Sequence, residues 1–567
     1  MDKIVRVDLT TGTIATEKVA DKYKKLGGRA LTAQILTDEV EPGCEPLGKR
    51  NKLVFAPGLL GGSFLSSSSR LSVGGKSPLT GGIKEANAGG TAAAALCHLG
   101  IKALIIEGES HIGYSRYLYI DKDKIELRPA EMSGQGVYSA AKLLFERYGE
   151  KTSLILIGPG GERGYASAGI TNTDAQGRPS RFCGRGGLGA VMGVKGLKAI
   201  VLDPAGADGV VYHDRKAFLE LNKELVKLLK ENPATGETYP KYGTAAMATR
   251  TNAINALPTR NFSAGNFECA DRIDGEYLYH LITKRGGEGE TTHACMPGCV
   301  IKCSNIYADT DGKEIVAPLE YETIGLMGSN LGIGNLDDIA RLNYLCNDLG
   351  LDTIEMGAAI GVAMDQGLIA FGDADGAADL LAEVAEDTIL GKVLGHGALI
   401  TGRVLGSRRI PVAKGQAMPA YDPRGVKGLG VTFATSAMGA DHTAGNTIRA
   451  EVDHTDPAPQ PGLSRNAQAM SMIADSMGLC LFLMPALGAH LDKLSLIYEH
   501  YSGVKIEAEE LREAAVRTLA VERDFNRSAG LSPAHDRLPE FMNDEPLPVI
   551  NSVFDVTLED LRKVHDQ

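Results

Sequence analysis

The segment His293-Ala-Cys295-Met-Pro-Gly-Cys299-Val-Ile-Lys-Cys303 places three thiols within nine residues. The Pro-Gly pair between the first two thiols interrupts any continuous helix and predicts a turn that brings the sulfur atoms together. Thiolates are soft ligands that suit iron–sulfur clusters or zinc. Because a cubane cluster usually takes four cysteines, we expect a fourth from elsewhere in the chain, and Cys480 is the candidate.

Other interpretations of this segment stay open. A zinc site of the Cys3His type would combine His293 with the three thiols. A radical-SAM cluster is a further alternative, although its usual cysteine spacing is shorter than the one present here. Free cysteine is also often a small buried hydrophobic residue, and packing is the prediction for the remaining five: Cys44, Cys97, Cys183, Cys269 and Cys346.

Glycine is concentrated in two regions of the chain. Paired glycines recur between Gly58 and Gly100, where they allow backbone amides to approach a ligand without an intervening Cβ. A second region, 184–189 (GRGGLG), is predicted to open a helix or an anion-binding nest that faces a phosphate. A dinucleotide-binding fold is a weaker alternative, because the sequence shows no clear strand directly before this loop.

A short pattern occurs twice, as Asn347-Asp-Leu-Gly-Leu-Asp352 and as Asp475-Ser-Met-Gly-Leu-Cys480. Glycine at the fourth position of each predicts the C-terminal cap of a helix. Two related turns indicate that the protein binds two related ligands.

The texture of the chain changes near residue 207. Before it, short apolar runs predict strands at 4–9, 52–56, 103–108, 153–158 and 198–203. After it, apolar spacing predicts amphipathic helices at 215–231, 336–349, 353–369, 377–391, 465–479 and 507–525. Since cores stop growing near ~250–300 residues, we expect three domains, at 1–207, 208–415 and 416–567.

Charge and hydropathy exclude two classes of partner. A net charge of -12 without a basic tract argues against nucleic acid. The chain has no apolar run of ~18 residues and no signal-like first segment, which predicts a protein that neither spans a membrane nor is secreted. The odd number of cysteines, nine, indicates free thiols or metal ligands rather than a disulfide framework. Because the chain shows neither a secretion signal nor a disulfide pattern, we expect a cytoplasmic protein.

Eight motifs in order along the chain resemble the aldehyde:ferredoxin oxidoreductase family: GGKSPLTG, EANAGG, GRGGLGAVMG, PKYGTA, EYE, GLD, YDPRG and DSMGLCLF. The resemblance extends from the N-terminus to about residue 548. It implies an α+β fold in which a β-rich, cofactor-binding first domain is followed by two mainly helical domains. It also implies three cofactors: a tungsten or molybdenum atom held by two pyranopterins, one [4Fe-4S] cluster and magnesium.

The resemblance assigns roles to individual residues. Arg70 would lie between a pterin and the cluster, and the backbones at Asn87 and Phe182 would hold the magnesium ion that bridges the pterin phosphates. The implied cluster ligands are the four cysteines 295, 299, 303 and 480. The implied cofactor-binding residues of the glycine loop and of the two turns are Gly184, Arg185, Gly186, Gly187, Asn347, Leu351, Asp352, Asp475 and Leu479.

Two residues are implied to be catalytic. Glu322 would act as a general base on water if burial raised its pKa. His442 would donate to the developing oxyanion, with Asp441 orienting it. A structural carboxylate and a polar core histidine are the alternatives. The YDPRG segment, 421–424 with its glycine, is predicted to be a structural turn without catalytic residues.

The sequence departs from the family pattern at several positions. Asn347 replaces an aspartate, and Thr292 stands where the first cluster cysteine usually falls, so that Cys303 substitutes for it. Arg341 and Tyr344 occupy positions that resemble a bridging-iron site in dimeric members, which leaves a homo-oligomer open.

The expected activity is oxidation of an aldehyde to the carboxylic acid, with electrons passing through the cluster to a ferredoxin or a small iron–sulfur subunit. A low-potential reductase of an aromatic acyl-CoA or carboxylic acid is the alternative on the same scaffold. A zinc-stabilised scaffold protein without catalysis is the alternative from another class. Nothing in the sequence selects tungsten over molybdenum.

Overall fold

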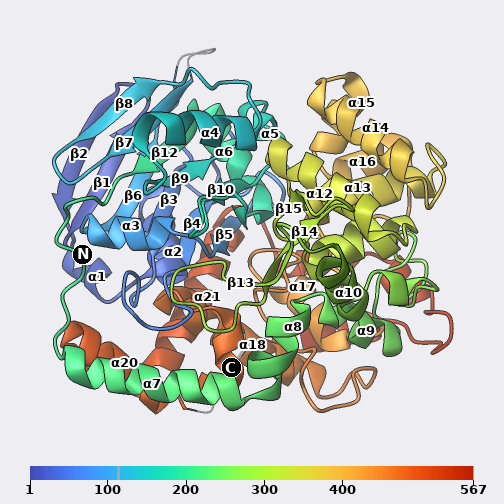
Figure 1. The fold of residues 1–567 in the computed structure, drawn as a ribbon. Helices are drawn as coiled ribbons and strands as arrows, with labels where there is room; N and C mark the ends of the chain where they lie inside the picture. The colour runs from blue at the N-terminus through green and yellow to red at the C-terminus, as the bar shows by residue number, and fades with distance from the viewer. Residues whose placement is uncertain (111–114, 489, 566–567) are drawn as a thin grey trace.

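The computed structural model describes residues 1–110, 115–488 and 490–565, and its first part contains two six-stranded sheets (Figure 1). The first has the order β2-β1-β6-β3-β4-β5. Its strands are β1 (Lys3–Asp8), β2 (Thr13–Lys18), β3 (Leu53–Pro57), β4 (Leu71–Lys76), β5 (Ile83–Ala88) and β6 (Ile101–Glu107). The second has the order β11-β10-β9-β12-β7-β8. Its strands are β7 (Arg116–Ile120), β8 (Ile125–Pro129), β9 (Ser153–Leu156), β10 (Ile170–Asn172), β11 (Arg181–Cys183) and β12 (Leu197–Leu202).

The two sheets repeat one topology. In the first, β1 and β6 are parallel and all other neighbours are antiparallel. In the second, β7 and β12 are parallel and all other neighbours are antiparallel. Strand β4 therefore corresponds to β10, and β5 to β11. The two halves of this part of the chain thus offer equivalent edges and turns to a ligand.

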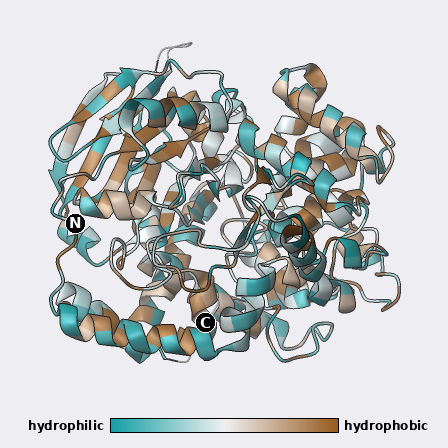
Figure 2. Cartoon of the chain, viewed as in Figure 1, coloured by the Kyte–Doolittle hydropathy of each residue, from teal (hydrophilic) through white to brown (hydrophobic). Residues whose placement is uncertain are grey.

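One hydrophobic core joins the sheets. It contains Val7 and Phe55 of the first sheet together with Leu118, Ile155 and Ile200 of the second. Central strands such as β3 are buried on both faces, which explains their nearly continuous apolar sequences. Figure 2 shows the corresponding concentration of hydrophobic residues on these strands.

Short helices accompany the sheets: α1 (Asp21–Lys24), α2 (Gly28–Glu39), α3 (Ala92–His98), α4 (Val137–Tyr148), α5 (Pro159–Glu162) and α6 (Leu188–Val194). The rest of the chain is mainly helical. It contains α7 (Arg215–Glu231), α8 (Tyr239–Tyr242), α9 (Ala246–Ala253), α10 (Gly275–Arg285), α11 (Tyr321–Thr323), α12 (Leu336–Leu349), α13 (Thr353–Asp365), α14 (Ala374–Ala385), α15 (Ile389–Gly395), α16 (Ala398–Leu405), α17 (Lys427–Thr435), α18 (Gln460–Met477), α19 (Met484–Leu487), α20 (Leu491–Ser502), α21 (Ala508–Ser528), α22 (Phe541–Asp544) and α23 (Leu558–Lys563).

Small sheets interrupt this helical part. One consists of β13 (Glu290–His293), β14 (Ser304–Ala308) and β15 (Glu314–Val316), and another of β16 (Val412–Ala413) and β17 (Gln416–Ala417). Helices α18 and α21 return to pack on α2, so the C-terminal part contacts the first sheet's side of the molecule (Figure 1). Among the described residues, no helix has the length and hydropathy needed to cross a membrane.

The predicted fold class, a β-rich first part followed by mainly helical parts, is confirmed. All five predicted strands are present, and α7 and α12 have the predicted limits. One helix prediction, 353–369, was too long, and another, 377–391, corresponds to parts of two helices. Helix α13 ends at Asp365 because Gly367 turns the chain with a φ of 78°, and 377–391 is divided because Asp387 has a φ of 58° and Thr388 caps a new helix.

Candidate functional site

Four cysteines gather from two distant segments. Cys295, Cys299 and Cys303 lie in the loop between β13 and β14, and Cys480 follows the turn after α18. The Cys295 thiol donates to Cys299, which lowers the pKa of Cys299 to about 6. Burial raises the pKa of Cys303 well above its usual range, with further contributions from Glu320, Cys480 and Cys299. Ser67 joins the two segments: its hydroxyl donates to Cys299 Sγ at 3.3 Å, and its carbonyl accepts from the Cys480 amide at 3.0 Å.

The structure places Cys303 next to the strand that ends at His293. The backbones of His293 and Cys303 form a parallel β-bridge, which brings Cys303 beside the segment that carries Thr292. The closing of the loop therefore supplies a third thiol where the usual position has none.

His293 is not free to join the thiols in a zinc site. Its Nε2 lies 2.9 Å from Asp174 Oδ2 and its Nδ1 lies 3.2 Å from Glu290 Oε2, so carboxylates occupy both ring nitrogens. Within the described residues, no three His, Cys, Asp or Glu side chains are close enough to share one metal ion. A cubane cluster suits the four thiols better, because it spaces its ligands more widely than a single ion does.

Arg70 links this thiol group to the second turn. Its Nε donates to Asn87 Oδ1 at 2.5 Å, and its Nη2 donates to the Asn87 carbonyl at 3.1 Å. The Asn87 amide in turn donates to Asp475 Oδ1 at 3.1 Å. Burial opposes the charge of Arg70, but Cys480, Cys295 and Asp475 outweigh it and raise its pKa. The guanidinium thus lies between the thiols and the second turn.

The two predicted turns dock in the same way on the two sheets. Gly350 and Gly478 cap α12 and α18 with φ values of 73° and 77°. The Arg70 amide donates to the Gly478 carbonyl at 3.0 Å, just before β4, and the Gly169 amide donates to the Gly350 carbonyl at 2.9 Å, just before β10. Leu479 and Leu351 form the adjoining β-bridges, to Ser68 and Ala168. The repeated sequence pattern is therefore a repeated structural unit.

The first turn differs from the second in its polar groups. Asn347 Nδ2 lies 3.4 Å from the Tyr138 hydroxyl, and Asp352 Oδ2 accepts from Arg185 Nε at 3.1 Å. Asp352 occupies the place that Cys480 has in the second turn, so only the second turn supplies a thiol. The second turn thus ends in a thiol, whereas the first ends in a buried ion pair.

The glycine loop corrects one expectation. It directly follows strand β11, whereas the sequence showed no clear strand there, because β11 is only three residues long. Gly186 and Gly187 have φ values of 83° and 73°, a conformation that favours glycine. Gly184 leads into the loop, and Arg185 Nη1 and Nη2 donate to the carbonyls of Ala440 and Ala417 at 2.7 Å. The loop therefore joins the second sheet to the C-terminal part.

The predicted magnesium-binding backbones occupy equivalent strands. Asn87 lies on β5 opposite Ser72, and Phe182 lies on β11 opposite Thr171. Both strands are sheet edges, and they contact each other. Edge strands leave one row of carbonyls without a strand partner. The Asn87 carbonyl accepts from Arg70 Nη2 at 3.1 Å, so an oxygen-seeking ion would bind the second lone pair of that oxygen.

Glu322 and His442 face each other. Glu322 Oε2 accepts from the Ala420 amide at 2.8 Å, while Oε1 lies 3.6 Å from His442 Nδ1. In the part of the chain that the structure describes, neither Glu322 Oε1 nor His442 Nδ1 has a hydrogen-bond partner. Burial raises the pKa of Glu322. The ring of Tyr421 lies 5.9 Å from that of His442. The pair therefore holds two polar atoms ready for a bound molecule.

Asp441 does not orient His442, contrary to expectation. Its carboxylate accepts from Lys84 Nζ at 2.5 Å and from the amide and hydroxyl of Thr443 at 2.9 and 2.7 Å. Although it is buried, Lys84 and Arg185 hold the pKa of Asp441 well below its usual range. Lys84 competes successfully for Asp441 because a buried cation needs a charged partner. The YDPRG segment is a structural turn, in which Arg424 and Asp422 pair at 2.7 Å.

Sequence reasoning missed several buried charges around the site. Lys84 and Glu85 lie on β5, Glu355 lies on α13, and Arg29 on α2 binds Glu522 on α21 through two hydrogen bonds of 2.8 and 2.7 Å. The adjacent charges Lys84 and Glu85 in a strand flanked by glycine pairs were an available signal. The Arg29–Glu522 pair had none, because its members are 493 residues apart.

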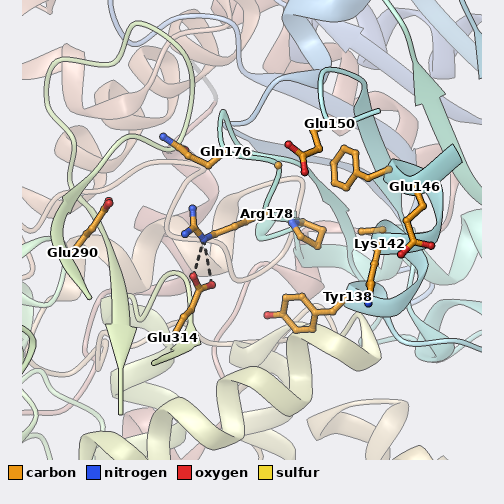
Figure 3. A pocket seen from close by; sticks show the side chains of 12 residues that line it. Tyr138, Lys142, Glu146, Glu150, Gln176, Arg178, Glu290 and Glu314 are labelled. Atoms are coloured by element: carbon orange, nitrogen blue, oxygen red, sulfur yellow. Dashed lines mark hydrogen bonds and ion pairs between the residues drawn. The ribbon is translucent and has the colours of Figure 1, made fainter. Parts of the chain in front are cut away.

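A separate cavity of about 690 Å³ lies between α4, the segment 176–179 and the strands β13 and β15 (Figure 3). Tyr138, Lys142, Arg178 and Glu314 line it, and Arg178 pairs with Glu314 at 2.9 Å. Neither Glu322 nor His442 contributes to its walls. Size alone therefore does not locate the chemistry of this protein.

Both parts of the chain match known sequence families. Residues 4–204 match the N-terminal domain of aldehyde ferredoxin oxidoreductase, and residues 220–564 match its domains 2 and 3. The chain belongs to the aldehyde ferredoxin oxidoreductase family. It is therefore an oxidoreductase-type enzyme of this family, and the predicted resemblance is confirmed.

Curated relatives extend over nearly the whole chain. The tungsten-containing aldehyde ferredoxin oxidoreductases of Pyrococcus abyssi and Pyrococcus furiosus are 34% and 33% identical to it, each covering 96% of this chain and 92% of the relative. The WOR-like subunit of an aliphatic sulfonate oxidoreductase from Pyrococcus furiosus is 28% identical over 92% of the chain and 85% of the relative.

A solved structure shares the fold. The active site complex BamBC of benzoyl coenzyme A reductase with 1,5-dienoyl-CoA superposes with a TM-score of 0.81 at 20% identity, covering 99% of this chain and 93% of the other. At this identity the likeness concerns the fold alone. Since one fold can carry different activities, the activity of this chain must be argued from its site.

Proposed function

We propose that this protein oxidises an aldehyde to the carboxylic acid at a tungsten, or molybdenum, bis-pyranopterin centre and passes the electrons through a [4Fe-4S] cluster. The observation that carries the proposal is the convergence of Cys295, Cys299, Cys303 and Cys480 beside Arg70, which also reaches Asn87. Family membership and relatives named as tungsten-containing support the cofactor assignment.

The residues present fit such cofactors. Two glycine-capped turns dock equivalently on two sheets, which suits two pterins. Asp475 and Asn347 carry the acceptors for pterin N–H groups. The backbones of Asn87 and Phe182 would hold magnesium between the pterin phosphates, with Gly184 to Gly187 at the phosphate side. When bound, the pterin metal supplies two-electron redox chemistry.

The chain's own residues supply the acid–base chemistry. Conversion of an aldehyde and water to a carboxylic acid releases two electrons and two protons. Glu322 Oε1 would accept a proton from the attacking water, since burial raises its pKa and makes it a stronger base than an exposed carboxylate. His442 would donate to the aldehyde oxygen as negative charge develops there. Glu322 Oε1 and His442 Nδ1 face each other and are 3.6 Å apart.

Electrons would leave through the cluster to a ferredoxin or a small iron–sulfur subunit. Arg70 contacts Asn87 and interacts with the thiols, so it would lie between the two cofactors and hold them in a fixed relation. Arg341 and Tyr344 stand at the positions resembling a bridging-iron site, and Arg341 instead pairs with Asp375 of its own chain at 2.7 Å.

The test combines metal analysis with turnover on protein purified without oxygen. We expect about one tungsten or molybdenum, with about four iron and four sulfide per chain, and aldehyde-dependent reduction of benzyl viologen with two electrons per aldehyde. Reduction of an aromatic acyl-CoA by a strong reductant, without aldehyde oxidation, would replace the proposal by the reductase alternative. Zinc without iron or tungsten would overturn it altogether.

A further inference from the structure

Three exposed cations lie near the cluster cysteines: Lys241, Lys302 and Arg449. Lys302 stands between Cys299 and Cys303, and its amide donates to the Cys299 thiol. Within the described ranges 1–110, 115–488 and 490–565, no carboxylate oxygen lies within 4.0 Å of any of the three side-chain cations. The protein carries a net charge of -12, so a group of unpaired cations is a local exception.

Helix α8, which carries Lys241, covers the cysteine loop. Thr292 Oγ1 donates to the Pro240 carbonyl at 2.6 Å. Gly243, at the end of the helix, is so close that a Cβ there would stand 2.8 Å from the Cys303 carbonyl oxygen. Lys241 is therefore exposed on a helix that lies directly against the cysteine loop.

An aromatic pair connects Arg449 to the fourth thiol. The Phe482 amide donates to the Cys480 thiol, and the Phe482 ring stacks on Tyr239 with centroids 4.4 Å apart. The Arg449 guanidinium lies 4.8 Å from the centre of the Tyr239 ring and 6.0 Å from that of Phe482. One pair of stacked rings thus lies between a cluster ligand and an exposed cation.

Arg449 is available to an anionic partner. Desolvation lowers its pKa, and no acidic group offsets this effect. Its contacts are with ring faces, which leaves the guanidinium N–H groups free for carboxylates. A guanidinium supported by aromatic rings is typical of the centre of a protein interface.

We propose that Lys241, Lys302, Arg449 and the Tyr239–Phe482 pair form the docking surface for an acidic iron–sulfur carrier protein. The inference rests on the proposed function, which requires two one-electron carriers to be reduced for each aldehyde oxidised. An acidic carrier is repelled by the overall charge of the enzyme, so local cations must direct it to the cluster. A small charged face suits the weak encounters typical of electron transfer.

The test compares two double variants that change the charge equally. Arg449→Glu with Lys241→Glu alters the docking surface. Lys18→Glu with Lys49→Glu alters two exposed lysines that also lack a carboxylate partner in the described chain, and β2, which carries Lys18, lies on a different side of the molecule from α8 (Figure 1). The probes are an acidic bacterial [4Fe-4S] ferredoxin and benzyl viologen.

We expect the first pair to lower kcat/KM for ferredoxin about tenfold or more and to weaken ferredoxin binding in calorimetry by a similar factor. In the Arg449→Glu/Lys241→Glu variant, the rate with benzyl viologen and the cluster spectrum should match those of the wild type. The Lys18→Glu/Lys49→Glu variant should change neither kcat/KM for ferredoxin nor ferredoxin binding by more than about twofold. Equal losses in both pairs, or no loss in the first, would overturn the docking surface. Absence of aldehyde oxidation in wild type would instead overturn the proposed function, and the calorimetry would still decide the docking.

Discussion

Gly58 and Gly478 are in direct backbone contact: a Cβ on Gly58 would stand 2.0 Å from the Gly478 amide nitrogen. The equivalent contact in the other half joins Gly158 to the first turn, where a Cβ would stand 2.3 Å from the carbonyl carbon of Leu349. Each sheet thus receives one turn through a glycine that has no room for a side chain.

Substitution of either glycine should therefore loosen a turn. We expect Gly58→Ala and Gly158→Ala each to lower the free energy of unfolding by about 1–3 kcal/mol, because backbone atoms cannot move aside as a side-chain end does. Urea unfolding measures the effect. Gly43→Ala is the matched control, since its Cβ would meet nothing within 4 Å. Equal stability of the Gly58 and Gly43 variants would contradict the explanation.

Cys303 and Thr292 offer a test of cluster ligation with a built-in rescue. Cys303→Ser should reduce bound iron and sulfide well below about four each per chain, because a cubane usually needs four thiolates. Thr292→Cys in that background should restore them, since the His293–Cys303 bridge places the two segments side by side. Metal analysis and electron paramagnetic resonance give the readout. Cys269→Ser should retain the cluster, because Cys269 packs against a different hydrophobic cluster from Cys295, Cys299 and Cys303. Loss of the cluster in Cys269→Ser together with its retention in Cys303→Ser would refute the assignment.

Glu322 should set the acid side of the pH profile. The pKa of Glu322 is raised by burial, so the base becomes protonated at a higher pH than an exposed glutamate, and kcat/KM should fall earlier on acidification. Glu322→Gln should lower kcat about 10²–10⁴-fold and abolish this limb. His442→Gln should lower the rate but keep the acidic limb of the pH profile. A Glu322→Gln enzyme with the wild-type rate and profile would exclude Glu322 as the base.

Glu355 should make stability fall as the pH rises. Burial raises its pKa from 4.5 to about 7, and its oxygens accept from the amides of Ala398 and Ala417 at 3.1 and 2.9 Å. Between these pH values the folded chain binds more protons than the unfolded chain, so the free energy of unfolding decreases with pH, by up to about 1 kcal/mol per unit.

Urea titrations at several pH values between the two pKa values measure that slope. Glu355→Gln cannot ionise, so its contribution to the slope should disappear even if the variant is less stable overall. The exposed Glu386→Gln serves as the control and should keep the wild-type slope. A slope that is the same in wild type and Glu355→Gln would show that Glu355 ionises similarly in both states.

Local patterns predicted the elements well, because they depend on neighbours in sequence. The limits of α7 follow from its apolar spacing and its Asp214 cap. Strand β11 was missed because three residues are too few to show an alternation. The domain limits after 207 and after 415 stay a prediction.

The site was predicted only in part. Its cysteines and glycine turns carry recognisable spacing, so they could be singled out. Asp441 was misassigned because adjacency to His442 suggested a partnership, whereas Lys84, 357 residues away, takes its carboxylate. Such pairings follow from burial, which a single sequence does not display.

The sequence by itself determined five strands of the two sheets, the long helices, the two capped turns and the supply of thiols, since each depends on residues within a few positions. The tertiary structure alone decided which groups meet. It brought Cys480 to Cys303, set Glu322 Oε1 facing His442, and directed Asp441 to Lys84. The physical reason is that buried charges and thiols interact through space in a low-dielectric interior, where the nearest partner is fixed by packing rather than by chain position.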